Sequence, residues 1–240
     1  MIEQNLQSIR QKLPSGVQLV AVSKFHPVPR LMEAYDAGQR IFAESRPQEL
    51  AAKVPRMPAD VQWHFIGHLQ TNKLKLVLPY VSLVQSVDSL HLLEAINAWA
   101  LANGRVVDVL LELHLGAEET KQGFSEEEIL EILTPCTKKG AFCSPDAENC
   151  VPVNKNEVFL FTGEGIRVRG LMGMATNTED MTVVERDFER IERLFLQIKQ
   201  TDMPGFDILS IGMSGDWPVA VRHGATMVRI GTDIFGPREY

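Results

Sequence analysis

Short apolar runs alternate with segments of helical periodicity along most of the chain. Eight runs rich in β-branched residues predict strands over residues 17–22, 40–43, 62–66, 81–87, 107–113, 166–171, 207–211 and 226–230. Segments with apolar positions three or four residues apart predict helices over residues 28–37, 47–54, 71–76, 90–102, 125–133, 182–200 and 216–223. A further helix over residues 2–13 precedes the first strand, and Pro14-Ser15-Gly16 ends it.

Strands that alternate with helices favour a parallel sheet with right-handed crossovers, and eight such units can close on themselves. The pattern therefore predicts an α/β fold, a (β/α)8 TIM-type barrel with an extra N-terminal helix. A chain of 240 residues suits one such unit, so we expect a single domain over residues 1–240. Residues 138–165 are rich in turn formers and break the alternation, which indicates an inserted loop or hairpin.

Charge and apolar length restrict the classes of partner. The formal net charge of -7 argues against a nucleic-acid partner, because binding a polyanion requires a basic patch. No stretch has the apolar length of a signal peptide or a bilayer span, so we expect a cytoplasmic protein without a membrane partner. Cys136, Cys143 and Cys150 include no closely spaced pair, which predicts reduced thiols and no metal site.

Lys24 directly follows the apolar run of the first strand. Barrels of this kind collect reactive groups where strands end and the following loops begin. A lysine at such a position is partly desolvated, which disfavours its charged form and leaves an amine able to attack an aldehyde. The alternative is a lysine that simply extends to solvent at a strand end.

Two loops near the end of the chain have the residues of a phosphate site. Gly231 and Thr232 follow the last strand, and Ser214 follows the seventh, just before a helix for which Asp216 is the expected N-cap. Barrels often bind phosphate after their seventh and eighth strands. Helix capping and turn formation alone are the alternative explanation, but the two loops are neighbours in barrel order.

Two further residue types bear on the chemistry. Arg229 lies within the last strand, where a buried guanidinium needs an acceptor such as a pyridine nitrogen or a carboxylate. His64 and His68 are four residues apart, a spacing that suits a metal only on a helix. Their segment reads as a strand followed by a turn, so we expect no metal site there.

Seven sequence blocks occur in order from the first strand to the last: AVSKFHPV (21–28), WHFIGHLQTNK (63–73), SVDS (86–89), EETKQGF (118–124), RGLMGM (169–174), SIGMSGDW (210–217) and VRIGTDIFG (228–236). Together they resemble the pyridoxal phosphate homeostasis protein family, the one-domain relatives of the alanine racemase N-terminal barrel. The resemblance implies that the cofactor is pyridoxal 5′-phosphate (PLP) and that Lys24 holds it as a Schiff base.

The resemblance also implies roles for other residues. It implies phosphate contacts from Ser214, Gly231 and Thr232, with Ser210 a weaker candidate, and a place for Arg229 near the pyridine nitrogen. An arginine leaves that nitrogen unprotonated, so the ring is a weak electron sink, which suits storage or racemisation better than transamination. The complete set of candidate cofactor contacts is Lys24, Ser45, His64, Met174, Ser210, Ser214, Arg229, Gly231 and Thr232.

Two positions and one inserted segment differ from the family pattern. Ser45 stands where the family usually has an asparagine near the cofactor ring, and its shorter side chain reaches less far. His114 replaces the usual asparagine of the fifth strand, where it can donate a hydrogen bond or reshape the pocket. The insertion at residues 138–165 is longer than the family's typical connection.

Three functions fit these features. The first is a non-catalytic carrier that captures PLP, buffers its concentration and passes it to apo PLP-dependent enzymes. The second is an amino-acid racemase, which needs a second acid or base that alanine racemases take from an additional domain. No such domain is expected in the few residues between the eighth strand and Tyr240. The third is a barrel that binds another phosphorylated metabolite without covalent chemistry. The resemblance to one-domain proteins favours a monomeric carrier.

Overall fold

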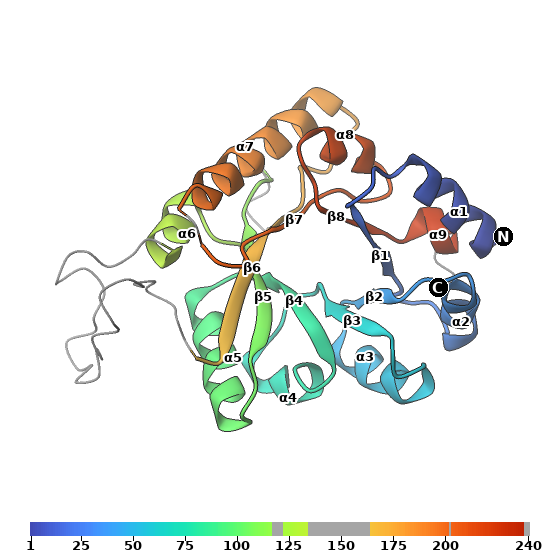
Figure 1. The fold of residues 1–240 in the computed structure, drawn as a ribbon, viewed down its shortest axis with the longest axis horizontal. Coiled ribbons are helices and arrows are strands. Elements are labelled where there is room, and N and C mark those ends of the chain that lie inside the picture. Colours follow the sequence, from blue (N-terminus) through green and yellow to red (C-terminus); the bar gives the residue numbers. More distant parts are fainter. Residues whose placement is uncertain (117–121, 134–163, 202, 238–240) are drawn as a thin grey trace.

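Eight parallel strands form a closed barrel in the computed structural model, which describes residues 1–116, 122–133, 164–201 and 203–237. Each strand pairs with the next along the chain, and β1 pairs with β8 to close the sheet. The strands are β1 (Gln18–Val22), β2 (Ile41–Glu44), β3 (Gln62–Phe65), β4 (Val81–Val87), β5 (Val107–Leu113), β6 (Ile166–Gly173), β7 (Ile208–Ser210) and β8 (Met227–Ile230). The predicted barrel and its eight strands are confirmed (Figure 1).

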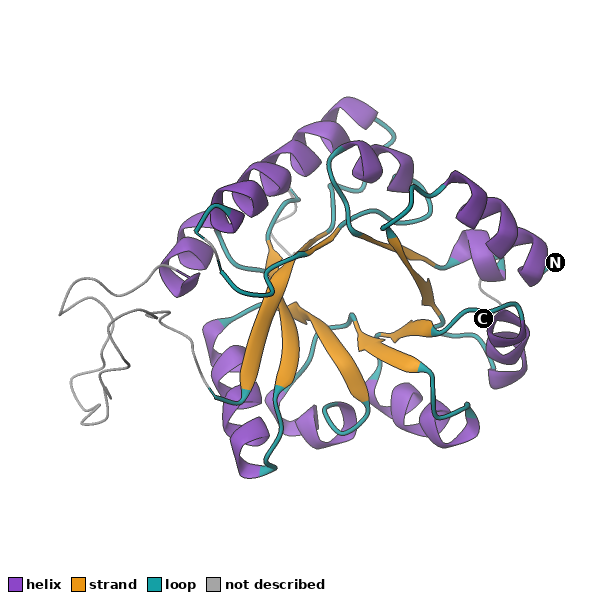
Figure 2. Cartoon of the chain, in the orientation of Figure 1, coloured by secondary structure: helices purple, strands orange, loops and turns teal. Residues whose placement is uncertain are grey.

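Helices surround the barrel on its outside (Figure 2). They are α1 (Ile2–Lys12), α2 (Val28–Asp36), α3 (Pro47–Lys53), α4 (Leu74–Val77), α5 (Leu90–Ala102), α6 (Glu126–Leu133), α7 (Met181–Lys199), α8 (Trp217–Arg222) and α9 (Thr232–Phe235), with 3-10 turns η1 (Val54–Arg56) and η2 (Thr71–Lys73). The helix expected over residues 71–76 is instead η2 followed by the single turn of α4. Pro79 follows closely, and it leaves no length for a longer helix.

The first helix holds the two ends of the described chain together. Ile2, Leu6 and Ile9 form its buried face. On its flank, Asn5 Nδ2 donates a hydrogen bond to the carbonyl oxygen of Ile234 at 3.0 Å. Figure 1 shows α1 beside α9, at the blue and red ends of the colour scale. The extra N-terminal helix thus supports the segment that follows the last strand.

Strand alternation divides the apolar side chains into two cores. The larger core lies between the strands and the helices. The smaller core fills the barrel interior and consists of Val20, Val22, Ala43, Leu83, Leu110, Met172 and Met227. Toward the carboxyl ends of the strands, buried polar residues join the apolar ones, among them His64, Gln85, Ser210 and Arg229. This end of the barrel is where active sites of the fold occur.

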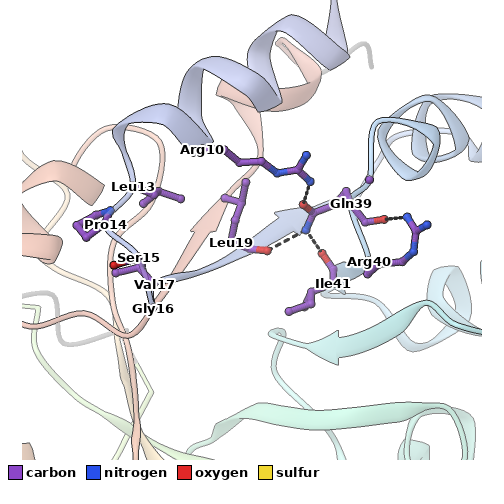
Figure 3. A pocket seen from close by; sticks show the side chains of 11 residues that line it. Arg10, Leu13, Pro14, Ser15, Gly16, Val17, Leu19, Gln39, Arg40 and Ile41 are labelled. Carbon is purple, nitrogen blue, oxygen red and sulfur yellow. Dashed lines mark hydrogen bonds between the residues drawn. The ribbon is translucent and has the colours of Figure 1, made fainter.

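The opposite end of the barrel has a cavity of about 410 Å³ beside the loop between α1 and β1 (Figure 3). Its polar side chains bind one another. Arg10 Nη2 donates to Gln39 Oε1 at 3.0 Å, and Gln39 Nε2 donates to the carbonyls of Leu19 and Ile41 at 2.8 and 2.7 Å. These bonds connect α1 to β1 and β2, a stabilising role that is typical of the amino ends of barrel strands.

The part of the chain that the structure describes contains no helix long and apolar enough to cross a bilayer. Within those same residues, no group of three or more His, Cys, Asp or Glu side chains is placed to hold a metal ion. The expected insertion lies outside the described residues, apart from Glu164 and Gly165. The three cysteines also lie outside them, so their predicted state stays a prediction.

Candidate functional site

Lys24 lies in a tight turn immediately after β1. The turn is closed by a hydrogen bond from His26 N–H to the Ser23 carbonyl at 3.1 Å. Phe25 has a φ of 68°, a left-handed conformation that is uncommon for a bulky residue and that surrounding contacts must hold. Val20 and Val22 face the barrel interior, and the half-buried Lys24 follows them at the carboxyl end of β1, on the rim of the barrel.

The Lys24 turn lies next to the segment that follows β8. Ala21 pairs with Ile230, and a Cβ added at Gly231 would lie 3.2 Å from the Val22 carbonyl oxygen. Beyond the strands, the ring of His26 stacks on the ring of Phe235 with 4.9 Å between centroids. The fold therefore brings the first predicted site residue beside the last two, Gly231 and Thr232, although they lie at opposite ends of the sequence.

The loop after β7 joins the same rim. The backbone N–H of Asp233, in α9, donates to Ser214 Oγ at 3.4 Å, so the two predicted phosphate loops are neighbours. Asp216 is the N-cap residue of α8, as expected, although its side chain accepts no hydrogen bond from that helix. Its carboxylate instead accepts the Met213 N–H at 2.5 Å and closes the loop on itself. The exposed carboxylate of Asp233 adds one negative charge beside Ser214.

Arg229 is buried inside the barrel, with its guanidinium bound to oxygen atoms of the two preceding strands. Its Nη1 donates to the carbonyl oxygen and to Oγ of Ser210, both at 2.7 Å, and its Nη2 donates to the Gly173 carbonyl at 2.9 Å. Burial lowers the pKa of Arg229 to about 10, while the nearby carboxyl groups of Glu112 and Asp216 raise it. The group therefore stays charged at neutral pH.

A hydrogen-bonded chain of buried side chains crosses the interior beneath the rim. Ser210 Oγ donates to Gln85 Oε1 at 2.7 Å, and Gln85 Nε2 lies 2.8 Å from His64 Nδ1. Burial lowers the pKa of His64 to about 4, so its ring is neutral and Nδ1 accepts from the amide. The one hydroxyl hydrogen of Ser210 is thus already donated to Gln85.

Glu112 is a buried carboxyl group that is not among the site residues predicted from the sequence. It lies on β5, two residues beyond Leu110 and hence on the same interior face. Burial raises its pKa to about 7, with Arg229 lowering it and Asp88 raising it. Asp88 itself lies 2.9 Å from Nδ1 of the exposed His68. A lone glutamate in the otherwise apolar end of a strand, LLEL, was the signal that could have identified it.

The remaining candidates lie around the rim. Ser45 follows β2 two residues after the interior-facing Ala43, and a Cβ at Gly67 would come within 2.1 Å of the Ser45 carbonyl oxygen, so only glycine fits beside it. Met174 follows β6 and packs against the interior cluster. His114 follows β5, and its carbonyl accepts a hydrogen bond from Arg190 Nη1 at 3.3 Å.

Taken together, the predicted residues occupy two levels of one end of the barrel. The rim carries Lys24, Ser45, Met174, Ser214, Gly231 and Thr232. The buried layer beneath it carries His64, Ser210 and Arg229. The arrangement offers a primary amine and a nearby pair of loops rich in hydroxyl and backbone N–H groups. The buried layer beneath them is hydrogen-bonded and contains the positive charge of Arg229.

The sequence matches known proteins over its full length. The family model for the alanine racemase N-terminal domain matches residues 1–143. The pyridoxal phosphate homeostasis protein of Haemophilus influenzae is 32% identical over 254 residues, covering 100% of this chain and 97% of that protein. The protein of the same name from Schizosaccharomyces pombe is 35% identical over 228 residues, covering 93% of this chain and 85% of the relative.

Solved structures share the barrel. PipY of Synechococcus elongatus without PLP superposes with a TM-score of 0.84 at 33% identity, covering 98% of this chain and 100% of PipY. PipY with PLP bound gives a TM-score of 0.78 at 30% identity and the same coverage. Alanine racemase of Clostridium difficile shares the fold alone, with a TM-score of 0.70 at 15% identity over 57% of its chain. The chain belongs to the pyridoxal phosphate homeostasis protein family, whose barrel is that of the alanine racemase N-terminal domain.

Proposed function

We propose that this protein binds PLP as a Schiff base on Lys24 and serves as a non-catalytic carrier of the cofactor. One observation carries the proposal: the Lys24 turn lies beside the Gly231–Thr232 segment, with His26 stacked on Phe235. An aldehyde with a phosphate tail needs both elements within reach of one molecule. PipY, a relative with the same barrel, has a structure with PLP bound.

The residues of the rim fit the cofactor's chemistry. The Lys24 amine would attack the aldehyde carbon, a C=N bond would form, and the carbonyl oxygen would leave as water. The hydroxyls of Ser214 and Thr232 and the backbone N–H groups around Gly231 would hold the phosphate. Ser45, His64 and Met174 would lie around the ring.

Arg229 favours storage or racemisation over reactions that need a strong electron sink. Its pKa of about 10 lies far above that of a pyridine nitrogen, so it would not give up a proton to the ring. An unprotonated ring draws electrons weakly from a bound amino acid. Holding the cofactor reversibly needs no such withdrawal, whereas most PLP-dependent reactions depend on it. The same residue can still donate a hydrogen bond toward the ring, and that fixes the orientation of the cofactor.

Racemisation is a second candidate, because Glu112 is a buried carboxyl group with a pKa near neutrality on the interior face of the barrel. A group of that kind can accept and return a proton at neutral pH. Simple non-covalent binding of a phosphorylated metabolite is a third candidate, and it predicts that Lys24 is dispensable.

We propose that the carrier works in the cytoplasm as a monomer made of a single domain, and that apo PLP-dependent enzymes receive the cofactor.

The carrier function is tested by loading and transfer. Purified protein should become yellow with PLP, keep the cofactor through gel filtration at the elution volume of a monomer, and restore activity to an apo PLP-dependent enzyme. Lys24→Ala should do none of these. Rapid interconversion of L- and D-alanine that is lost in Glu112→Gln would favour a racemase instead. Phosphate-dependent binding that is equal in the wild type and Lys24→Ala would favour the non-covalent alternative.

A further inference from the structure

A buried ionic cluster lies directly behind the turn that carries Lys24. The cluster consists of Glu44 at the end of β2 and of Glu49 and Lys53 in α3. Lys53 Nζ donates to Glu44 Oε1 at 2.7 Å and to Glu49 Oε1 at 2.6 Å, and it also donates to the Ser23 carbonyl at 2.8 Å. Lys53 is 5% exposed and Glu44 is fully buried. One ammonium group therefore joins two carboxylates and the backbone of the turn.

The cluster binds both chain neighbours of Lys24. Glu44 Oε1 accepts the hydroxyl hydrogen of Ser23 at 2.6 Å, and Glu49 Oε1 accepts the backbone N–H of Phe25 at 2.7 Å. The guanidinium of Arg46 lies 4.5 Å from the centre of the Phe25 ring. These contacts hold Phe25 in its left-handed conformation, and that conformation sets the direction in which the turn presents Lys24.

Burying these charged groups costs desolvation free energy. Burial raises the pKa of Glu44, and Lys53 lowers it again by attraction and hydrogen bonding. The second oxygen of Glu44, Oε2, is buried and has no hydrogen-bond partner among the described residues. Apolar side chains of similar size usually stabilise a protein at least as well as a buried ion pair. What the charges add is geometric: they fix the Ser23 carbonyl, the Ser23 hydroxyl and the Phe25 N–H at once.

A cavity of about 340 Å³ adjoins the cluster on its outer side, lined in part by His26, Glu49, Lys53 and Arg56. Glu49 is the most accessible member, with 20% of its side chain exposed. It can therefore be changed without leaving a void in the core, which makes it the best member to substitute. The charged groups that surround the turn are Glu44, Glu49, Lys53, Arg46 and Arg56, and the buried His26 belongs to the turn itself.

We propose that Glu44, Glu49 and Lys53 are positioning residues, which hold the Ser23–His26 turn so that the Lys24 amine is directed toward the Gly231–Thr232 segment. The inference rests on the proposed Schiff base at Lys24. It assigns these three residues no contact with the cofactor. They act through the backbone on either side of the reacting lysine.

The test compares Glu49→Ala, which removes the acceptor of the Phe25 N–H, with Glu49→Gln, which keeps an acceptor but removes the charge. Gln48→Ala, exposed on the same helix, is the matched control. Glu49→Ala should weaken PLP binding about three- to tenfold. This is less than the full effect of one lost charge-assisted hydrogen bond, because the bond is made to the backbone beside Lys24 and not to the cofactor. Glu49→Gln should bind PLP nearly as well as the wild type. Gln48→Ala should match it.

A second readout separates positioning from a merely structural role. Both Glu49 variants remove the same negative charge, so the pH midpoint of the Schiff-base absorbance should shift further in Glu49→Ala, which also loses the acceptor of the Phe25 N–H, than in Glu49→Gln, and it should not shift in Gln48→Ala. A folded Glu49→Ala that binds PLP as tightly as Glu49→Gln would overturn the inference. If that variant does not fold, Ser23→Ala, which removes only one hydroxyl from the cluster, must show the same loss of affinity. A wild type that forms no adduct at Lys24 would instead refute the proposed function itself.

Discussion

Arg229 Nη1 lies 2.7 Å from both the carbonyl oxygen and Oγ of Ser210. This contact joins β8 to β7 inside the barrel, where β7 is only three residues long. A third bond, from Nη2 to the Gly173 carbonyl, extends the connection to β6. Arg229 therefore connects three strands by hydrogen bonds, and it also places a positive charge in the buried layer beneath the candidate site.

Arg229→Leu should destabilise the protein by about 2–4 kcal/mol, because it leaves buried carbonyl groups of Ser210 and Gly173 without donors. Chemical denaturation measures the change. Arg229→Lys keeps the charge without the planar fork and should lie between the wild type and Arg229→Leu. A loss below about 0.5 kcal/mol for Arg229→Leu, the range of ordinary surface changes, would mean that these bonds do not support the barrel.

Glu112 should make stability fall as pH rises. Its folded-state pKa, about 7, lies above its ordinary value of 4.5, so the folded state binds the proton more tightly. This contribution is complete below pH 4.5 and is lost as pH rises toward 7. Glu112→Gln should therefore be more stable than the wild type by about 1–3 kcal/mol at pH 8 and nearly equal at pH 4.5. The exposed Glu131→Gln is the control, and equal pH profiles for wild type and Glu112→Gln would refute the assignment.

His64 should act in the opposite direction. Its folded-state pKa, about 4, lies below its ordinary value of 6.5, because burial disfavours the charged ring. The unfolded state then binds the proton more readily, and stability is lost as pH falls from 6.5 to 4. Thermal unfolding of His64→Gln should show a weaker dependence on pH in that interval than the wild type, whereas His91→Gln on the surface should not. An identical slope in His64→Gln would show that the ring is not shielded from solvent.

Asp233→Asn should strengthen the binding of a phosphorylated ligand. The Asp233 carboxylate is exposed beside Ser214, where it would repel an anion held by the two loops. Removing one exposed charge should improve the PLP dissociation constant by about two- to fivefold at low salt, and by less at high salt. Glu33→Gln, on the surface of α2, is the control for net charge. Weaker binding by Asp233→Asn would place the phosphate elsewhere.

The barrel could be predicted from the sequence because its signals are local. The period of apolar residues identifies each strand, and barrel order alone then puts the loop after β8 beside the loop after β1. That is why Lys24 and Gly231 could be assigned to one site. The length of α4 was harder to predict, because it is set by the nearby Pro79 and not by the period of the apolar residues.

Other site features depend on contacts between distant residues. Ser210 and Gln85 are 125 positions apart, and only the folded chain shows that the Ser210 hydroxyl is already donated. The raised pKa of Glu112 comes first from burial and then from the Asp88 carboxylate, which follows β4 and is distant in sequence. The cluster behind the Lys24 turn likewise combines β2 and α3 with the end of β1.

One primary amine at the rim of the barrel, that of Lys24, is expected to carry the cofactor. Protein incubated with PLP, reduced with borohydride and digested should yield a single modified peptide, with the adduct mass on Lys24. The Glu49 and Gln48 variants should be modified at the same residue, and Lys24→Ala at none. An adduct on another lysine, or no adduct in the folded wild type, would contradict this account.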